Sequence, residues 1–204
     1  MVSNVNTKFF TAEEITNTST TVKSYLETNH ALPSSVNISG TTVTMPQFLK
    51  LLTTTVTNLH GNLNTTMALQ SYSTATSPSE SVTGGSLNST AYLNLANGVI
   101  SYMDTNGRAP DNYSTSLGNV RYESLVYLYS LILDHYGNKT QLPPSITVTP
   151  WSVVSNSSSK FFTTEEIEGA AKTVQSHVEA NHALPSNITI SGTAVTMPQF
   201  LQLA

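Results

Sequence analysis

Residues 29–49 read NHALPSSVNISGTTVTMPQFL, and this stretch returns at residues 181–201 as NHALPSNITISGTAVTMPQFL. Its Leu-Pro is typical of the end of a helix, and its Met-Pro places a proline in the first turn of another helix, where the missing N–H costs nothing. Between them, β-branched residues alternate on both sides of a Ser-Gly turn, which predicts a short β-hairpin. The stretch therefore predicts a helix, a hairpin and a second helix, in that order.

The duplication extends beyond this stretch. Lys8-Phe9-Phe10-Thr11 returns at residues 160–163, so the offset is 152 residues throughout, and about two thirds of the aligned positions are identical. A degenerate third copy lies between them at an offset of about 77 residues; it keeps the apolar positions but replaces His30 by Gly107 and Pro46 by Glu123. A shared apolar pattern predicts a shared fold, whereas the changed polar residues permit a different binding role.

These repeats divide the chain. Residues 1–61 form a strict first repeat, 62–87 a connecting segment, 88–137 a divergent second repeat, 138–159 a linker, and 160–204 a strict third repeat whose second helix still continues at Ala204. The pattern indicates a longer array of strict and divergent pairs. A unit of about 45 residues buries too little surface to be stable alone, so adjacent repeats are expected to pack in pairs. The expected fold is α+β and mainly helical.

Further signals concern the helix starts and the connecting segments. Thr11 with Glu14, and Thr163 with Glu166, have the Thr-x-x-Glu spacing of a capping box at a helix start. Residues 62–70 could hold an extra helical turn, and the Ser-, Thr- and Gly-rich residues 71–86 are expected to form a flexible loop. In the linker, residues 146–148 have β character. Trp151 is expected to pack against the preceding repeats, with stacking on a carbohydrate as the alternative.

The composition excludes several classes of partner. Charged residues make up 10% of the chain, the net charge is −4, the pI is near 5.6, and the few Lys and Arg residues are scattered. A nucleic-acid partner would need clustered basic residues to neutralise phosphates, so none is expected. The sequence has no apolar run long enough to cross a bilayer, so membrane insertion is not expected either. The absence of cysteine removes disulfides and thiolate chemistry.

Catalytic and metal-binding patterns are also missing from the sequence. No Gly-x-Ser-x-Gly frame occurs, and the five histidines lack the spacing of a metal site. Asp104-Thr105-Asn106-Gly107 resembles the start of a calcium loop, but Arg108 stands where a ligand oxygen is needed. We therefore expect no catalytic residue, no metal site and no cofactor, and a hydrolase is the weakest of the functional hypotheses.

The order of Leu-Pro, a β-branched strand, a Gly turn and Met-Pro-x-Phe-Leu resembles the pseudomurein-binding repeat. It is matched at Leu32-Pro33, Gly40 and residues 45–49 and again in the third repeat, whereas the second repeat lacks Met-Pro. That family occurs in tandem on surface proteins of methanogenic archaea and in phage-encoded pseudomurein endoisopeptidases. The resemblance implies an extracellular, non-catalytic module at the cell wall or cell surface that anchors a larger protein to pseudomurein. A structural stalk or adhesin segment without wall affinity is the alternative.

Candidate contacts with the wall polymer lie mainly at the end of the first helix of each repeat. Neutral amide and imidazole groups suit sugar hydroxyls and peptide amides, which favours Asn29 with His30, Asn181 with His182, and the divergent pair Asn106 and Arg108. Tyr113, in a polar loop, is the aromatic side chain expected to be most exposed. The alternative is that Asn29 and Asn181 only end their helices in the left-handed conformation. The third repeat is expected to expose an apolar face through which the chain could self-associate.

Overall fold

The computed structural model describes residues 7–157 and 160–204. Residues 1–6 of the expected first repeat and residues 158–159 of the expected linker lie outside them. The chain is α+β, with about 51% of its residues in helices and with small antiparallel sheets of two strands each. It divides into two compact units, Met1–Ser157 (unit 1) and Ser158–Ala204 (unit 2).

Three parts of the chain each consist of a helix, a β-hairpin and a second helix. Segment 1 (residues 12–60) contains α1 Ala12–Asn29, β2 Ser35–Ile38, β3 Thr41–Thr44 and α2 Met45–His60. Segment 2 (residues 89–139) contains α3 Ser89–Asn106, β6 Asn112–Thr115, β7 Gly118–Arg121 and α4 Tyr122–Lys139. Segment 3 (residues 164–203), in unit 2, contains α6 Thr164–Asn181, β9 Asn187–Ile190, β10 Thr193–Thr196 and α7 Met197–Leu203. The order of elements predicted from residues 29–49 is present in each.

Hydrogen bonds join the start of α1 to its hairpin. The Glu14 carboxylate accepts from the N–H of Thr11 at 2.8 Å, and the Glu14 N–H donates to Thr11 Oγ1 at 3.2 Å, which forms the predicted capping box. The same carboxylate accepts from the hydroxyl of Ser39 in the hairpin turn. Ser39 and Gly40 have φ values of 47° and 81°, as the tight turn between two twisted strands requires. Segment 3 repeats these contacts with Thr163, Glu166 and Ser191.

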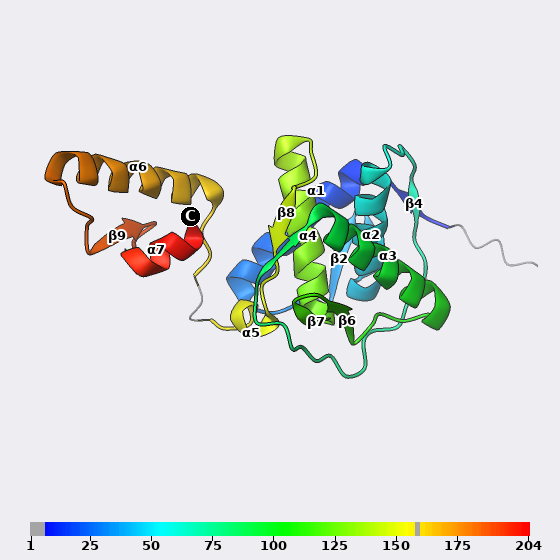
Figure 1. Cartoon of the computed structure of the whole chain (residues 1–204). Helices are drawn as coiled ribbons and strands as arrows, with labels where there is room; N and C mark the ends of the chain where they lie inside the picture. Colours follow the sequence, from blue (N-terminus) through cyan, green and yellow to red (C-terminus); the bar gives the residue numbers. More distant parts are fainter. Residues whose placement is uncertain (1–6, 158–159) are drawn as a thin grey trace, which may run out of the picture. The chain divides into compact units, whose positions relative to one another are not determined.

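The core of unit 1 forms where the helices of segments 1 and 2 pack across each other. The most extensive helix contacts join α1 to α4 and α2 to α3, and α2 also packs against α4 (Figure 1). Every residue from Leu125 to Ser130 of α4 is buried, as are Leu49, Leu51 and Leu52 of α2. These two helices are therefore buried on most sides. α1 and α3 instead bury one stripe each, as amphipathic surface helices do.

The segment between α2 and α3 is hydrogen-bonded to the rest of unit 1, contrary to the flexible loop expected. Residues 62–70 contain no helical turn; they contain β4 Met67–Ala68, which pairs with β1 Phe9–Phe10. Residues 71–86 then run along segment 2, where the Asp111 carboxylate accepts from the N–H groups of Thr76 and Ser77 at 2.6 and 2.8 Å. The expectation failed because a Ser- and Thr-rich composition does not reveal hydrogen-bond partners that lie far away in the sequence.

Residues 138–157 of the expected linker also belong to unit 1. β8 Ser145–Thr147 pairs with β5 Ser86–Asn88, which confirms the β character of this stretch. A short helix, α5 Trp151–Val154, follows; the N–H groups of Trp151 and Ser152 donate to the Glu80 carboxylate at 2.8 and 3.1 Å. Trp151 is half-buried. The first unit therefore extends past α4 to the end of α5.

Unit 2 exposes apolar side chains whose counterparts in unit 1 are buried. Its core is small and consists of Ala170, Ile188, Ile190, Val195 and Phe200. Leu201 of α7 is 80% exposed, although its counterpart Leu49 of α2 is fully buried. The reason is that, within residues 160–204, no element takes the place that α3 and α4 have in unit 1.

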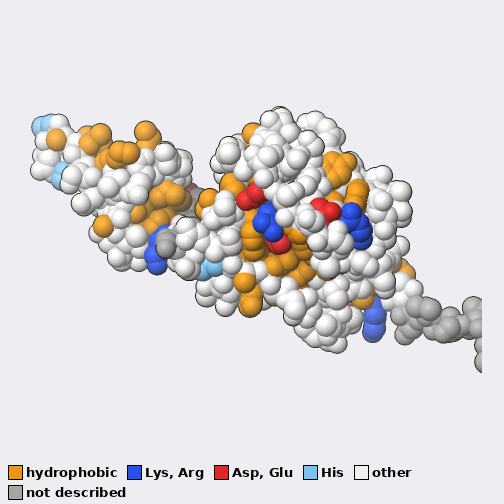
Figure 2. Space-filling model, turned by 90° about the horizontal axis from the view of Figure 1, so that it is seen from below, with side chains coloured by type: hydrophobic (Ala, Val, Ile, Leu, Met, Phe, Trp, Pro, Cys, Tyr) orange, Lys and Arg blue, Asp and Glu red, His pale blue; other side chains and the backbone are white. Residues whose placement is uncertain are grey.

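The surface carries few charges. Figure 2 shows one face on which side chains that are neither charged nor hydrophobic, together with the backbone, cover most of the area, while some basic side chains lie next to acidic ones. Ion pairs join Lys50 to Asp104 at 2.6 Å and Arg121 to Glu123 at 2.7 Å. Among the helices that the structure describes, none has the length and apolar character needed to cross a lipid bilayer.

The hairpin contact of Glu14 makes the stability of unit 1 sensitive to acid. The hydrogen bond from Ser39, with that from the Thr11 backbone, holds the pKa of Glu14 below its ordinary value of 4.5. Because the pKa is lower in the folded than in the unfolded chain, the carboxylate stabilises unit 1 above about pH 4.5, and this contribution is lost as the pH falls through the folded value. We expect Glu14→Gln to lower the melting temperature of unit 1 at pH 7 and to flatten its loss of stability in acid.

Scanning calorimetry at several pH values measures this effect. Glu166→Gln is the matched control, because it removes the same contact from unit 2 and should lower only the transition of that unit. An unchanged melting temperature of the Glu14→Gln variant at pH 7 would contradict the prediction.

Candidate functional site

The predicted contact residues lie at three separate helix ends. Asn29, Asn106 and Asn181 are the last residues of α1, α3 and α6. In each, the side-chain Nδ2 donates to the backbone oxygen four residues earlier, at 2.9, 2.8 and 3.0 Å respectively, so the amides satisfy the last helical turn. Among the described residues of unit 1, α1 and α3 make no extensive contact, and α6 belongs to the other unit.

The left-handed conformation belongs to the residue after each asparagine. His30, Gly107 and His182 have φ values of 54°, 63° and 52°. The alternative that Asn29 and Asn181 adopt this conformation is therefore wrong. Glycine adopts a positive φ without steric cost, whereas a residue with a side chain loses on the order of 1 kcal/mol there. The two strict copies thus keep a histidine where glycine would fit the backbone better.

The two histidines have different surroundings. His30 is half-buried, and its ring Nδ1 lies 2.9 Å from the backbone oxygen of Val154 in α5. This contact holds the end of α1 against the last element of unit 1. His182 is exposed at the equivalent position of unit 2. His30 therefore has a structural role, and His182 is the more accessible of the two.

Arg108 and Tyr113 also make contacts within unit 1. Arg108 pairs with Asp111 at 3.3 Å and lies over the ring of Tyr102, 5.6 Å from its centroid. Tyr113 does not lie in an exposed loop, as the sequence suggested; it is half-buried in β6, and its phenol ring packs over Gly98 of α3. The expectation was wrong because Gly98 leaves space beside the helix that a strand residue can fill.

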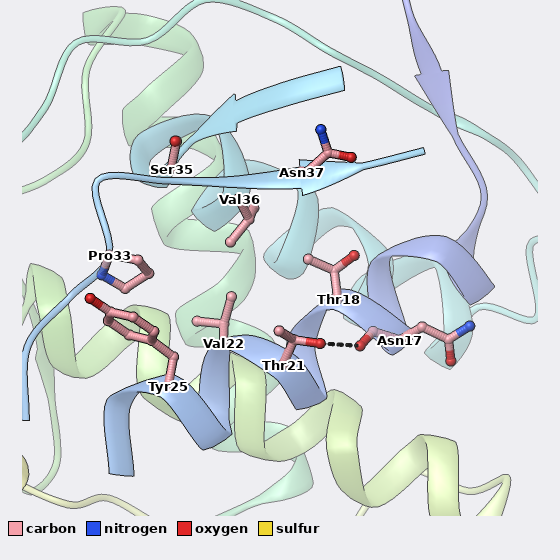
Figure 3. Close-up of a pocket in the computed structure, with 9 residues that line it drawn as sticks. All are labelled: Asn17, Thr18, Thr21, Val22, Tyr25, Pro33, Ser35, Val36 and Asn37. Carbon is pink, nitrogen blue, oxygen red and sulfur yellow. Dashed lines mark hydrogen bonds between the residues drawn. The ribbon is translucent and has the colours of Figure 1, made fainter. Parts of the chain in front are cut away.

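A groove of about 470 Å³ opens between α1 and β2 of segment 1 (Figure 3). Its helix side consists of Asn17, Thr18, Thr21, Val22 and Tyr25, and its strand side of Pro33, Ser35, Val36 and Asn37. In Figure 3, Val36 points from β2 toward α1, where Val22 faces it. The volume falls in the range of about 300–1,000 Å³ that is typical of small-ligand sites.

The groove has an apolar floor and an uncharged rim. Val22, which is 1% exposed, forms the floor together with Pro33 and Val36, and Tyr25 offers a 42% exposed ring at one end. The remaining lining residues carry amide or hydroxyl groups, and none of the lining residues is charged. The groove therefore suits a neutral ligand that has both an apolar face and hydrogen-bonding groups.

Motif residues line a second hollow, of about 320 Å³, beside the hairpin. Leu32, Pro33 and Ser34 form one side of it, and Thr44, Met45 and Pro46 form another. Met45 is only 3% exposed, and Pro46 is buried as well. The repeated residues of the stretch 29–49 therefore serve mainly to form the hairpin and to start α2.

Titratable groups with shifted pKa values join one element to another. Burial raises the pKa of Glu27 in α1, whose carboxylate accepts from Tyr127 Oη of α4 at 2.8 Å. Partial burial also acts to raise the pKa of Asp104, but hydrogen bonds from Lys50 at 2.6 Å and Tyr72 at 2.8 Å outweigh it, so this pKa is lowered. In the described part of the chain, no three acidic or histidine side chains are grouped closely enough to hold a metal ion.

Comparisons of the chain with protein-family models, with curated proteins and with solved structures found no match. Its function is therefore inferred from the residues of the groove and from the repeated motif.

The groove was not predicted from the sequence, because the prediction favoured the residues that recur most strictly. A difference between the copies could have revealed it. Thr21 and Val36 of segment 1 correspond to Gly98 and Tyr113 of segment 2. Such a paired exchange, smaller on the helix and larger on the strand, indicates two positions that face one another and a space that is open in one copy and filled in the other.

His182→Gly and His30→Gly are expected to affect stability differently, although both histidines have a positive φ. His182→Gly removes a side chain from a left-handed position, so we expect it to stabilise unit 2 by about 0.5–1 kcal/mol. His30→Gly relieves the same strain but loses the contact with Val154, which is worth about 1 kcal/mol. We therefore expect it to leave unit 1 unchanged or slightly less stable. Urea unfolding of each variant measures the difference, and a clear stabilisation by His30→Gly would refute the structural role of His30.

Proposed function

We propose that this chain is a non-catalytic cell-wall-binding module that anchors a larger surface protein or enzyme to pseudomurein outside the cell. The observation that carries the proposal is the groove of segment 1, whose apolar floor and uncharged rim suit an uncharged part of a polymer. The resemblance of residues 29–49 and 181–201 to the pseudomurein-binding repeat supports the identity of that polymer. His182, exposed at the end of α6, is a further candidate contact in unit 2.

The proposal includes tandem repeats that pack in pairs. It is supported by the reciprocal packing of α1 on α4 and of α2 on α3. In such a pair, the strict repeat contacts the wall, and the divergent repeat completes the core. Weak contacts by several strict repeats on one chain then reinforce each other on a repeating polymer, because the first contact raises the effective concentration of the next.

A structural stalk or adhesin segment is the second candidate function. The observation that favours it is the burial of the motif, since Met45, Phe48 and Leu49 are at most 3% exposed. The fold alone can therefore explain why these residues recur. Only binding to the isolated polymer distinguishes the two functions.

Purified pseudomurein sacculi are expected to carry the chain into the pellet on centrifugation. Because the groove is uncharged, retention should change little when the salt concentration is raised to about 0.5 M, which screens charge interactions. Bacterial murein is the control for specificity, and equal retention on it would reduce the proposal to general wall affinity. A chain that remains in the supernatant with pseudomurein would show that the wall-binding function is wrong.

Segment 3 is expected to bring two molecules together at high protein concentration. Leu201, 80% exposed, gains about 1.5–3 kcal/mol when it is buried. We expect sedimentation velocity to show concentration-dependent association that Leu201→Gln abolishes. Val153→Gln is the matched control, because it removes an exposed apolar side chain from unit 1. Sedimentation as a monomer at every concentration would contradict this prediction.

A further inference from the structure

We propose that the groove between α1 and β2 binds one face of a neutral sugar ring, and that Tyr113 fills the equivalent groove of segment 2. The inference rests on the proposed wall-binding function, since the sugar would belong to the glycan of the wall polymer. It names the site and the ligand class, and it assigns binding to the strict copies alone.

The two grooves are equivalent position by position. β2 and β6 begin at the same distance after their helices, and α1 and α3 have the same length. Val22 and Pro33 correspond to Val99 and Pro110, and Tyr25 corresponds to Tyr102. Part of the lining is thus retained in segment 2. Thr21 and Val36, at the centre of the groove, change to Gly98 and Tyr113, and the rim residues Thr18, Ser35 and Asn37 change to Leu95, Asn112 and Ser114.

Tyr113 and Gly98 fit together closely. A Cβ atom added to Gly98 would lie 2.2 Å from Tyr113 Oη and 2.4 Å from its Cζ, so any residue other than glycine would overlap the ring. Glycine in the middle of a helix is unfavourable by about 1 kcal/mol relative to alanine, and close contact with another group is a common reason for keeping it. The ring of Tyr113 therefore occupies the space beside α3.

This internal ring indicates what fits the open groove. In segment 2 the space between helix and strand accepts a six-membered ring that carries a hydroxyl group, because Gly98 has no side chain. In segment 1 the Thr21 side chain takes up the part of this space nearest the helix, but Val36 ends at its two methyl groups, and a groove of about 470 Å³ remains. An external ring of the same size could lie there against Val22 and Val36.

The chemistry of the rim favours a sugar over the other rings available in biology. A pyranose has a face of C–H groups that would pack on Val22, Pro33 and Val36, and hydroxyls at its edge that require hydrogen-bonding partners. Asn17, Thr18 and Thr21 provide amide and hydroxyl groups along the helix side of the groove. The absence of charge among the lining residues disfavours a charged peptide. Tyr25 presents an exposed aromatic ring at the end of the groove, as sites with partly apolar ligands often do.

Segment 3 also lacks an aromatic residue at the centre of the equivalent position. Thr173 and Ile188 stand at the positions of Thr21 and Val36, and Pro185 at that of Pro33; Ile188 is buried in the core of unit 2. Gly169 and His177 replace Asn17 and Tyr25, so the rim differs although no aromatic residue fills the centre. Binding by segment 3 is therefore expected to use edge contacts that differ from those of segment 1.

The test transplants the filling ring between segments of the full chain. Val36→Tyr with Thr21→Gly closes the groove of segment 1, and Tyr113→Val with Gly98→Thr opens that of segment 2. Amide resonances are followed by NMR during titration with peptide-free glycan fragments of pseudomurein, and in parallel with the peptide fragments of the same polymer. Thr42→Tyr, at an exposed position of β3, is the control for adding a tyrosine to the hairpin.

With the wild-type chain, the glycan fragments are expected to shift resonances around Thr21 and Val36. The closing variant should lose these shifts while those of segment 3 persist, and its affinity in segment 1 should fall at least tenfold. The opening variant should acquire new shifts around residues 98 and 113, which supports the proposal even if the closing variant does not fold.

Three results would overturn the proposal: unchanged glycan shifts in segment 1 of a folded closing variant, no new shifts in a folded opening variant, or groove shifts produced by the peptide fragments alone. Sedimentation with intact sacculi is measured on the same proteins. Retention of the wild-type chain together with any of these results refutes the sugar groove and leaves the wall-binding function standing. Failure of the wild-type chain to sediment with the sacculi refutes the wall-binding function itself.

Discussion

The burial of α2 and α4 on most of their sides is the constraint on which unit 1 depends. Leu49 and Leu52 of α2, like Leu125 and Tyr129 of α4, are fully buried. A helix with apolar residues on several faces cannot be covered by its own hairpin and first helix, so each needs the first helix of the other segment. The resulting crossed packing, α1 on α4 and α2 on α3, makes a single core out of two segments.

The candidate groove is a consequence of this packing. α1 is fixed to α4 along its inner face by the ion pair of Lys23 with Asp134 at 3.2 Å and by the hydrogen bond of Tyr127 to Glu27 at 2.8 Å. The hairpin is fixed at its turn to the start of the same helix through Glu14. With both elements held, the size of the residues between them decides whether the space stays open, as it does beside Val36, or is filled, as it is by Tyr113.

Segments 1 and 3 show that identical residues have different surroundings in the two units. Leu49 is in the core of unit 1, whereas Leu201, with the same neighbours in sequence, is exposed in unit 2. His30 contacts Val154, whereas His182 is exposed. Under the proposed function, the strict copies bind the wall and the divergent copies complete the core, so each kind of repeat has a separate role. That division would allow the proposed wall-binding residues to change without disturbing the packing of the core.

The order of helix, hairpin and helix was determined by the sequence alone, because the capping box, the Ser-Gly turn and Met-Pro act over a few residues. The same holds for the apolar stripes of α1 and α3, which follow from helical periodicity. The pairing of β1 with β4, the course of residues 71–86 along segment 2 and the groove between α1 and β2 were decided only by the tertiary structure. Each of these features depends on groups that lie far apart in the chain. A polar composition does not reveal which distant backbone group a side chain will bind, or that a ring will pack beside a glycine such as Gly98.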